Sequence, residues 1–425
     1  MTAAPGARPA PRLAAALAEW DAARLAVAAV FLLDGVTWGL WVAHLPLIKG
    51  ALRLSDLQFS YALAGIVLGA FVAQPLAGAL ATRVGTRRVT RPASALGSLA
   101  LGVPALAPSL PLLVAACALL GLTRGATEVP MNGQATLVEA RDGVPRMSAF
   151  HGCFSLGGFL GSGLAALLLR AGHDARATLL VAGVASAALS VFATRTLLRD
   201  APAPGAHGPG AHATAEREAR PSLATAVRDR LLLALGALGF LGLFGEGAMS
   251  DWSALALQRT AGAGVDAAAL GYAAFSVAMT AGRFTGDATV GRVGRARTLR
   301  ASGLLAAAGL TLALTAPYWA AVSGYALVGL GYANLVPILF SAGGRRAGAA
   351  GIAAVSTLAY LGLVVGPPVV GGLSTLLGSL PLALGVVAVF ALVIALGAGA
   401  VGPDEAEREP PSAAMRSGQR DRMPG

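Results

Sequence analysis

The sequence RVGTRR at residues 83–88 recurs as RVGRAR at residues 292–297, an offset of 209 residues. Two more stretches repeat in the same order. GATEVPM, which begins at Gly125, recurs loosely as GYANLVPI from Gly331, and LGGFLG recurs as LGLVVG 205 residues later. Each match is short, but three matches in one order at nearly one offset indicate a duplication. The sequence therefore predicts two similar halves, related as a parallel repeat.

The composition places the chain in a membrane. It has 425 residues, 56% apolar and 12% charged, with a mean hydropathy of +0.68, whereas about a quarter of the residues of a soluble domain are charged. A helix needs about 20 mostly apolar residues to cross roughly 30 Å of hydrocarbon. Twelve windows meet this need: 24–47, 57–81, 92–108, 111–136, 147–170, 177–195, 231–257, 268–288, 299–316, 318–341, 349–376 and 379–402. We predict an all-α integral membrane protein whose twelve transmembrane helices form two pseudo-symmetric six-helix halves.

The basic residues predict the orientation. Arginines follow every second window, as in the repeated RVG stretches, whereas few lie in the alternate loops. Those few basic residues are Lys49, Arg53, Arg170, Arg176 and Arg259. Because cytoplasmic loops carry the excess of Lys and Arg, we expect both termini in the cytoplasm. The basic cytoplasmic loops then account for the net charge of +11. We expect the protein to contact the lipid bilayer and not nucleic acid.

One polar segment divides the chain. Residues 196–230 include APAPGAHGPGAHATAEREAR, which is too polar and too rich in Pro, Gly and Ala to cross a bilayer. We expect a cytoplasmic linker here, between an N-terminal half at 24–195 and a C-terminal half at 231–402. Residues 1–23 and 403–425 are expected to be cytoplasmic tails.

The stretch GALATRVGTRR, from Gly78 to Arg88, resembles the signature loop of the major facilitator superfamily, although Thr82 stands where that loop has an aspartate. In the second half, GRFTGDATVGRVG looks like the matching loop. The resemblance implies the twelve-helix fold of that superfamily and a transporter that works by alternating access. It also implies a conformational loop made of Gly78, Arg83, Gly85, Arg87, Arg88, Arg283 and Asp287.

Within that superfamily, the run from Glu128 to Asn132, followed by FHGCFSLGGFLG at 150–161, resembles the fucose permease branch of sugar/proton symporters and its bacterial relatives. By that resemblance Glu128 is a proton-coupling carboxylate. The branch has a second coupling acid in its first span. Here Asp34 lies earlier in the helix, and His44 is nearer the expected place.

Three charges lie deep in the first and fourth apolar windows. Asp34 is about ten residues into the first window, roughly 15 Å deep, and Arg124 precedes Glu128 by one helical turn. A charge at that depth costs roughly 2.5 to 3.5 kcal/mol and usually faces a protein interior or a cavity. Two acids share one arginine, so one carboxylate lacks a partner, which suits a proton carrier. A purely structural triad, or recognition of a charged solute by Arg124, stays open.

Other side chains are candidates for contacting a solute. Trp38 and Trp41 offer flat apolar faces, and Glu246 lies between two glycines in the seventh window. Polar candidates are Asn132, Gln134 and Asn334, for which hydrogen bonding between helices is the alternative. Asp251 is expected near the membrane surface, in contact with water.

Together these features predict a proton-coupled secondary transporter that moves a small organic solute, a sugar being one candidate, across a bacterial inner membrane. No ATP-binding motif is present, so an ion gradient should drive transport, with sodium open as the ion. We expect a monomer without cofactor or metal. A proton-driven efflux antiporter for drugs or metabolites is the alternative within the class.

Two other classes fit less well. A membrane enzyme would need a nucleophile with a base or a metal cluster, and the sequence has no HExxH, GxSxG or Cys/His cluster. A receptor or scaffold would need an output domain, for which the linker and the tail are too short.

Overall fold

The computed structural model describes residues 21–142, 146–199 and 229–402, and these residues are almost wholly helical. The helices of the first group are α2 (Ala22–Ala51), α3 (Asp56–Val84), α4 (Thr86–Ala100), α5 (Leu110–Asp142), α6 (Met147–Arg170) and α7 (Ala175–Ala193). Those of the second group are α10 (Arg230–Ala261), α11 (Val265–Val293), α12 (Arg295–Thr315), α13 (Tyr318–Tyr332), α14 (Leu335–Leu377) and α15 (Leu380–Gly397). Short 3-10 turns are η1 (Pro104–Leu106), η2 (Thr194–Thr196) and η3 (Ala398–Val401).

Within the described ranges, eleven helical stretches are long and apolar enough to cross a membrane. The expected window 92–108 is the exception, because α4 has only 15 residues and carries arginines in its first two turns. The chain continues through a turn into η1, so the stretch 86–106 still has the length of one crossing at about 1.5 Å per residue. The predicted all-α, twelve-pass fold is confirmed, and its third crossing consists of the short helix α4 followed by η1.

The longest helix, α14, is a folded hairpin rather than a rod. Residues eight apart in a straight helix are about 12 Å apart, yet a Cβ added to Gly351 would collide with the carbonyl oxygen of Gly343. The chain therefore reverses between them. One membrane span runs from Tyr318 to Ala347, through α13 and the start of α14, and the next runs from Ala354 to Leu377.

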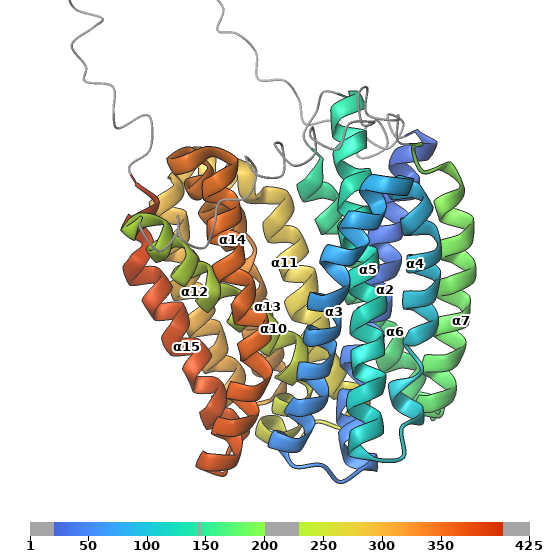
Figure 1. Cartoon of the computed structure of the whole chain (residues 1–425). Coiled ribbons are helices and arrows are strands. Elements are labelled where there is room, and N and C mark those ends of the chain that lie inside the picture. The colour runs from blue at the N-terminus through green and yellow to red at the C-terminus, as the bar shows by residue number, and fades with distance from the viewer. Residues whose placement is uncertain (1–20, 143–145, 200–228, 403–425) are drawn as a thin grey trace, which may run out of the picture.

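The helices pack as two groups, α2–α7 and α10–α15, which lie side by side in Figure 1. In the first group, α3 packs on α5 and α2 on α6, and in the second, α10 packs on α14 and α12 on α13. The groups meet mainly where α6 packs on α11 and where α3 packs on α14. The division at 195 and 231 stays a prediction, since residues 200–228 of the expected linker lie outside the described part, as do residues 1–20 and 403–425 of the expected tails.

The repeated RVG sequence has a structural cause. Gly85 joins α3 to α4 at φ 94° and ψ 144°, and Gly294, 209 residues later, joins α11 to α12 at φ 92° and ψ 156°. Residues with a Cβ rarely adopt this conformation. Each expected loop is thus a single glycine between two helices, with Gly78 and Arg83 in α3 and Arg87 in α4.

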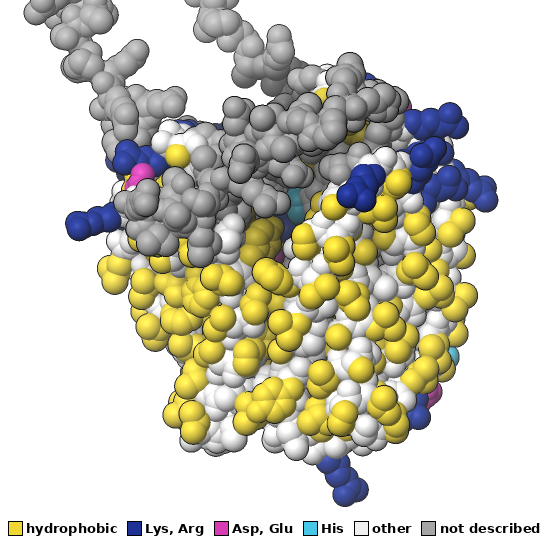
Figure 2. Space-filling view, viewed as in Figure 1, with side chains coloured by type: hydrophobic (Ala, Val, Ile, Leu, Met, Phe, Trp, Pro, Cys, Tyr) yellow, Lys and Arg dark blue, Asp and Glu magenta, His cyan; other side chains and the backbone are white. Residues whose placement is uncertain are grey.

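The two ends of the bundle differ in charge. We call the end with the two glycine joints the basic end, where arginine side chains gather at the top of Figure 2. Apolar side chains cover the flank below it, as a surface in contact with lipid requires. Both ends of the described chain, at the start of α2 and after α15, lie at the basic end (Figure 1).

Candidate solute-binding cavity

A cavity of about 380 Å³ lies between the two groups of helices. Its walls come from α2, α3, α5 and α6 of the first group and from α10, α11 and α14 of the second. This volume falls in the range of pockets that hold small organic molecules, roughly 300 to 1,000 Å³. The charged residues of its wall are Asp34, Arg124, Glu128, Glu246, Asp251 and Arg283.

On the first group, Arg124 pairs across helices rather than along its own. Its Nη2 lies 3.0 Å from Oδ2 of Asp34 on α2, and its Nη1 donates to the Asp34 carbonyl oxygen at 3.4 Å. Both side chains are less than one-fifth exposed. The Arg124 guanidinium also lies 4.5 Å from the ring centroid of Trp38. One side of that ring therefore already faces a cation, and Trp38 also lines the cavity, as expected of a residue that contacts a solute.

Glu128 has an uncharged partner. Its Oε2 accepts a hydrogen bond of 2.8 Å from Nε2 of Gln74 on α3. Although Arg124 is one turn away, Glu128 forms no ion pair within the described residues. Of the two acids that share one arginine, Asp34 is therefore the one that pairs with Arg124, and Glu128 has no counter-charge.

A second arginine–carboxylate pair faces the cavity from the other group. Nη2 of Arg283 on α11 lies 3.2 Å from Oε1 of Glu246 on α10, and Nη1 donates to Oγ of Ser155 on α6 at 2.9 Å. Ser276 on α11 also donates to the Ser155 carbonyl oxygen, at 2.9 Å. Arg283 therefore connects an acid of the second group with a helix of the first.

The repeat accounts for the position of Arg283. Gln74 and Arg283 are 209 residues apart, the same offset as the two glycine joints, and each donates to a carboxylate of its own group. The sequence placed Arg283 in a conformational loop together with Asp287. In the structure Arg283 is inside α11 and lines the cavity, the side chain of Asp287 is outside the described part, and Arg292 occupies the position equivalent to Arg83.

Asp251 also lines the cavity, contrary to its expected place at the membrane surface. No hydrogen bond or ion pair of its side chain is found among residues 21–142, 146–199 and 229–402. A pattern in the sequence could have revealed it, because the cavity residues of α10 recur at the spacing of one helix face. They are Leu243, Glu246, Gly247, Ser250 and Asp251.

The uncharged candidates divide into two sets. Asn132 lines the cavity, where its Nδ2 donates to the Glu128 carbonyl oxygen at 2.9 Å and its Oδ1 lies 3.2 Å from His151 Nε2. Trp41, Gln134 and Asn334 do not line it. Trp41 is 1% exposed in the helix core, Gln134 donates to Thr86 and to the carbonyl oxygen of Leu198, and Asn334 packs on Gly286.

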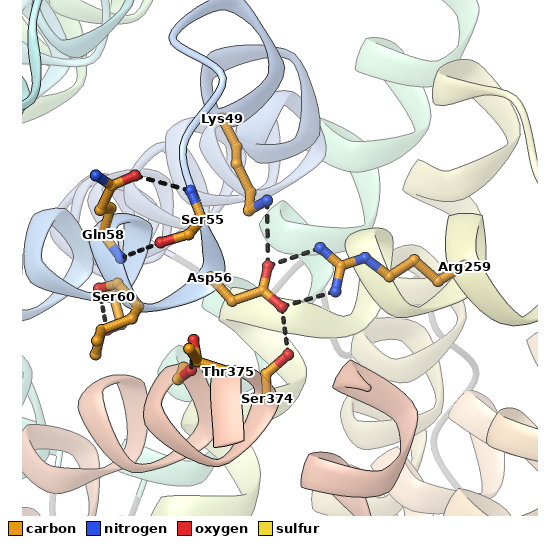
Figure 3. Close-up of polar contacts among 10 residues, drawn as sticks. Lys49, Ser55, Asp56, Gln58, Ser60, Arg259, Ser374 and Thr375 are labelled. Atoms are coloured by element: carbon orange, nitrogen blue, oxygen red, sulfur yellow. Dashed lines mark hydrogen bonds and ion pairs between the residues drawn. The ribbon is translucent and has the colours of Figure 1, made fainter. Parts of the chain in front are cut away.

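A cluster that the sequence analysis missed closes the end opposite the basic end (Figure 3). Asp56, at the start of α3, is 7% exposed and accepts hydrogen bonds of 2.6 and 2.7 Å from Arg259 at the end of α10. Lys49 of α2 lies 3.1 Å from the same carboxylate, and Ser374 of α14 donates to it. We call these four residues the Asp56 cluster. It ties the first group to two helices of the second.

At the basic end, the ion pairs of the described residues stay within one group. Arg24 binds Asp142 at 2.6 Å in the first group, and Arg346 binds Asp229 at 2.8 Å in the second. The hydrogen bond from Arg346 holds the pKa of Asp229, which precedes α10, below its usual value. The charge links between the groups that the structure describes are therefore concentrated at the Asp56 cluster and at Arg283.

Helices that cross a membrane and enclose a cavity between two groups are typical of a multi-pass membrane transporter. The family model of the Major Facilitator Superfamily matches residues 26–351. An uncharacterised MFS-type transporter of Yersinia pestis is 33% identical over 375 residues, covering 87% of this chain and 94% of its own. The membrane protein MosC of Rhizobium meliloti is 34% identical over 358 residues, covering 83% of this chain and 84% of its own. The chain belongs to the Major Facilitator Superfamily, and it is a transporter rather than an enzyme.

Solved structures agree on the fold. The nucleoside transporter NupG superposes with a TM-score of 0.69 at 14% identity, covering 89% of this chain and 98% of NupG. A D-xylose-proton symporter gives a TM-score of 0.68 at 17% identity, covering 88% of this chain and 96% of its own. At such low identity these likenesses show the fold alone.

Proposed function

We propose that this protein is a proton-coupled secondary transporter of a small organic solute and that Glu128 carries the proton. One observation supports this most directly. Glu128 faces the cavity with a neutral amide as its partner, while the nearby Arg124 is held by Asp34. A carboxylate that lacks a counter-charge away from water has its charged form disfavoured, so it can accept and release a proton as its surroundings change.

The geometry suggests how the proton acts on the helices. When Glu128 is protonated, Arg124 binds Asp34 and thereby links α5 to α2. When Glu128 loses the proton, its negative charge is one helical turn from Arg124 and competes with Asp34 for the guanidinium. The proton therefore controls the strength of a contact between helices, which is how a bound ion can bias alternating access.

The expected orientation indicates the side of the membrane to which the cavity is closed. With the basic end in the cytoplasm of a bacterial inner membrane, both termini are cytoplasmic, and the Asp56 cluster lies at the outer face. The cavity is then closed to the outside by a buried carboxylate held between the groups. Access from outside requires this cluster to separate.

A vesicle experiment tests the proposal. Right-side-out vesicles with wild-type protein or Glu128→Gln receive a panel of sugars, nucleosides, amino acids and amines without sodium, and the external pH is recorded. Symport alkalinises the medium when the right solute is added, and antiport acidifies it. We expect the signal to vanish in Glu128→Gln.

The matched control is Asp266→Asn, which removes an acid of α11 outside the cavity and should leave the signal intact. Full proton movement in Glu128→Gln would show that another group carries the proton. A solute flux that appears only after sodium is added, and that moves no protons, would refute proton coupling as a whole.

A further inference from the structure

The cavity holds more negative than positive charge. Its wall has four carboxylates, Asp34, Glu128, Glu246 and Asp251, and two guanidinium groups, Arg124 and Arg283. Each arginine is paired with one acid. With all of them ionised, four negative and two positive charges leave a net charge of two negatives.

The two remaining acids are on opposite sides. Glu128 belongs to α5 of the first group, and Asp251 belongs to α10 of the second. Asp251 lies eight residues before Arg259, about 12 Å along the helix, so it is near the closed end of the cavity. The amide of Gln74 holds Glu128, whereas Asp251 has no polar partner in the part of the chain that the structure describes.

The excess of two negative charges in the cavity favours some solutes over others according to their charge. An acid without a partner is costly away from water unless it is neutralised or paired. A carboxylate or phosphate solute would add to the excess, and a neutral solute would leave it unchanged. A solute with one positive charge compensates one acid, and a proton on Glu128 compensates the other.

The wall beside Asp251 also suits a cation. Tyr272 and Phe275 of α11 line the cavity with ring centroids 5.9 Å apart, and Tyr272 lies next to Ser250, the neighbour of Asp251 on the α10 face. Aromatic faces attract ammonium groups. The Asp251 carboxylate and these rings line the same cavity, so a solute can pair its charge with the carboxylate and place an apolar part against the rings.

We propose that the transported solute carries a protonated amine and that Asp251 binds this amine beside Tyr272 and Phe275. The inference rests on the proposed transport function. It adds a division of roles, in which Glu128 of the first group takes the proton and Asp251 of the second group takes the solute's charge. Loading then places one positive charge on each group.

The test measures binding in detergent, where no gradient exists. Purified protein is titrated with matched pairs of an amine and its alcohol or N-acetyl derivative, such as glucosamine with N-acetylglucosamine and phenylethylamine with phenylethanol. The shift in melting temperature and intrinsic tryptophan fluorescence report binding. We expect the amine of at least one pair to bind tenfold or more tightly than its neutral counterpart.

Variants locate the effect. Asp251→Asn should abolish the amine preference, Asp251→Glu should restore most of it, and Asp266→Asn should leave it unchanged. The melting temperature without ligand shows that each variant is folded. Failure of every amine to bind, equal binding of both members of each pair, or an amine preference that survives in Asp251→Asn would overturn the proposal.

The outcome is separable from that of the transport proposal. Binding in detergent does not depend on proton coupling, so the amine preference can hold while Glu128→Gln leaves proton movement intact. Conversely, proton-coupled uptake of neutral sugars without amine binding would leave the transport proposal standing and refute the role of Asp251.

Discussion

At the scale of single residues, the contacts of Arg124 explain how far the sequence could go. The charges Asp34, Arg124 and Glu128 were recognisable because each lies in an apolar window. Which acid binds the arginine was not, since the choice depends on how α2 and α5 face each other. The structure gives the arginine to Asp34 and gives Glu128 the amide of Gln74, a residue with no local signal.

The Asp34–Arg124 pair leads to a stability prediction. Arg124→Gln leaves Asp34 without its partner, and breaking a buried pair from one side costs about 3 kcal/mol or more. We expect a clear fall in the melting temperature in detergent. The double variant Asp34→Asn with Arg124→Gln should recover much of the loss, because no uncompensated charge remains. A double variant as unstable as the single one would show that the pair acts through packing alone.

At the scale of elements, the positions of the helices followed from the sequence, whereas the conformation of their connections did not. Windows of about 20 apolar residues reflect one physical need, the thickness of the bilayer, so the expected spans lie within or close to the observed helices. The reversal inside α14 was expected, because the windows 318–341 and 349–376 lie on either side of it; the sequence did not show that helical residues continue through the turn. Asp251 was wrongly expected at the membrane surface because it lies near the end of the apolar window 231–257. It lines the cavity because it shares one face of α10 with Glu246.

The glycine joints give a prediction at this scale. Gly294→Ala forces a Cβ into a backbone with φ 92°, at a cost of about 1 to 3 kcal/mol. Gly291→Ala is the matched control, since it lies three residues earlier inside α11 with open space around it. There alanine should stabilise the helix by roughly 0.5 to 1 kcal/mol. Thermal unfolding that ranks the two variants in the opposite order would contradict the role of the joint.

At the scale of the whole molecule, the two groups of helices are held together by contacts that join distant parts of the sequence. Asp56 and Arg259 are 203 residues apart, and Ser155 and Arg283 are 128 apart. No periodicity in the sequence indicates such pairs. The duplication predicted the two groups, but their closure at one end had to be seen in the structure.

The Asp56 cluster gives a prediction about conformation. Asp56→Asn removes the charge that binds Arg259 and Lys49, so it should favour separation of the closed end by about tenfold, or roughly 1.4 kcal/mol. Spin labels attached at Ala51 of the first group and at Leu377 of the second can measure this separation, because both positions are exposed near this end. Their distance distribution should gain a longer component. Asp174→Asn removes an acid next to α7 but keeps a side-chain oxygen that can cap this helix, so it serves as control, and an unchanged distribution in Asp56→Asn would exclude the cluster as a lock.

In the mechanism proposed above, the excess of negative charge in the cavity makes the carrier sensitive to voltage. Moving one elementary charge through 100 mV changes the free energy by about 2.3 kcal/mol. With Glu128 and Asp251 both ionised, the empty cavity is negative, and an inside-negative potential favours turning it outward, toward the state in which the Asp56 cluster is broken. A proton and an ammonium group cancel the two charges. The membrane potential would then drive the return of the empty carrier, while the loaded carrier crosses without electrical work.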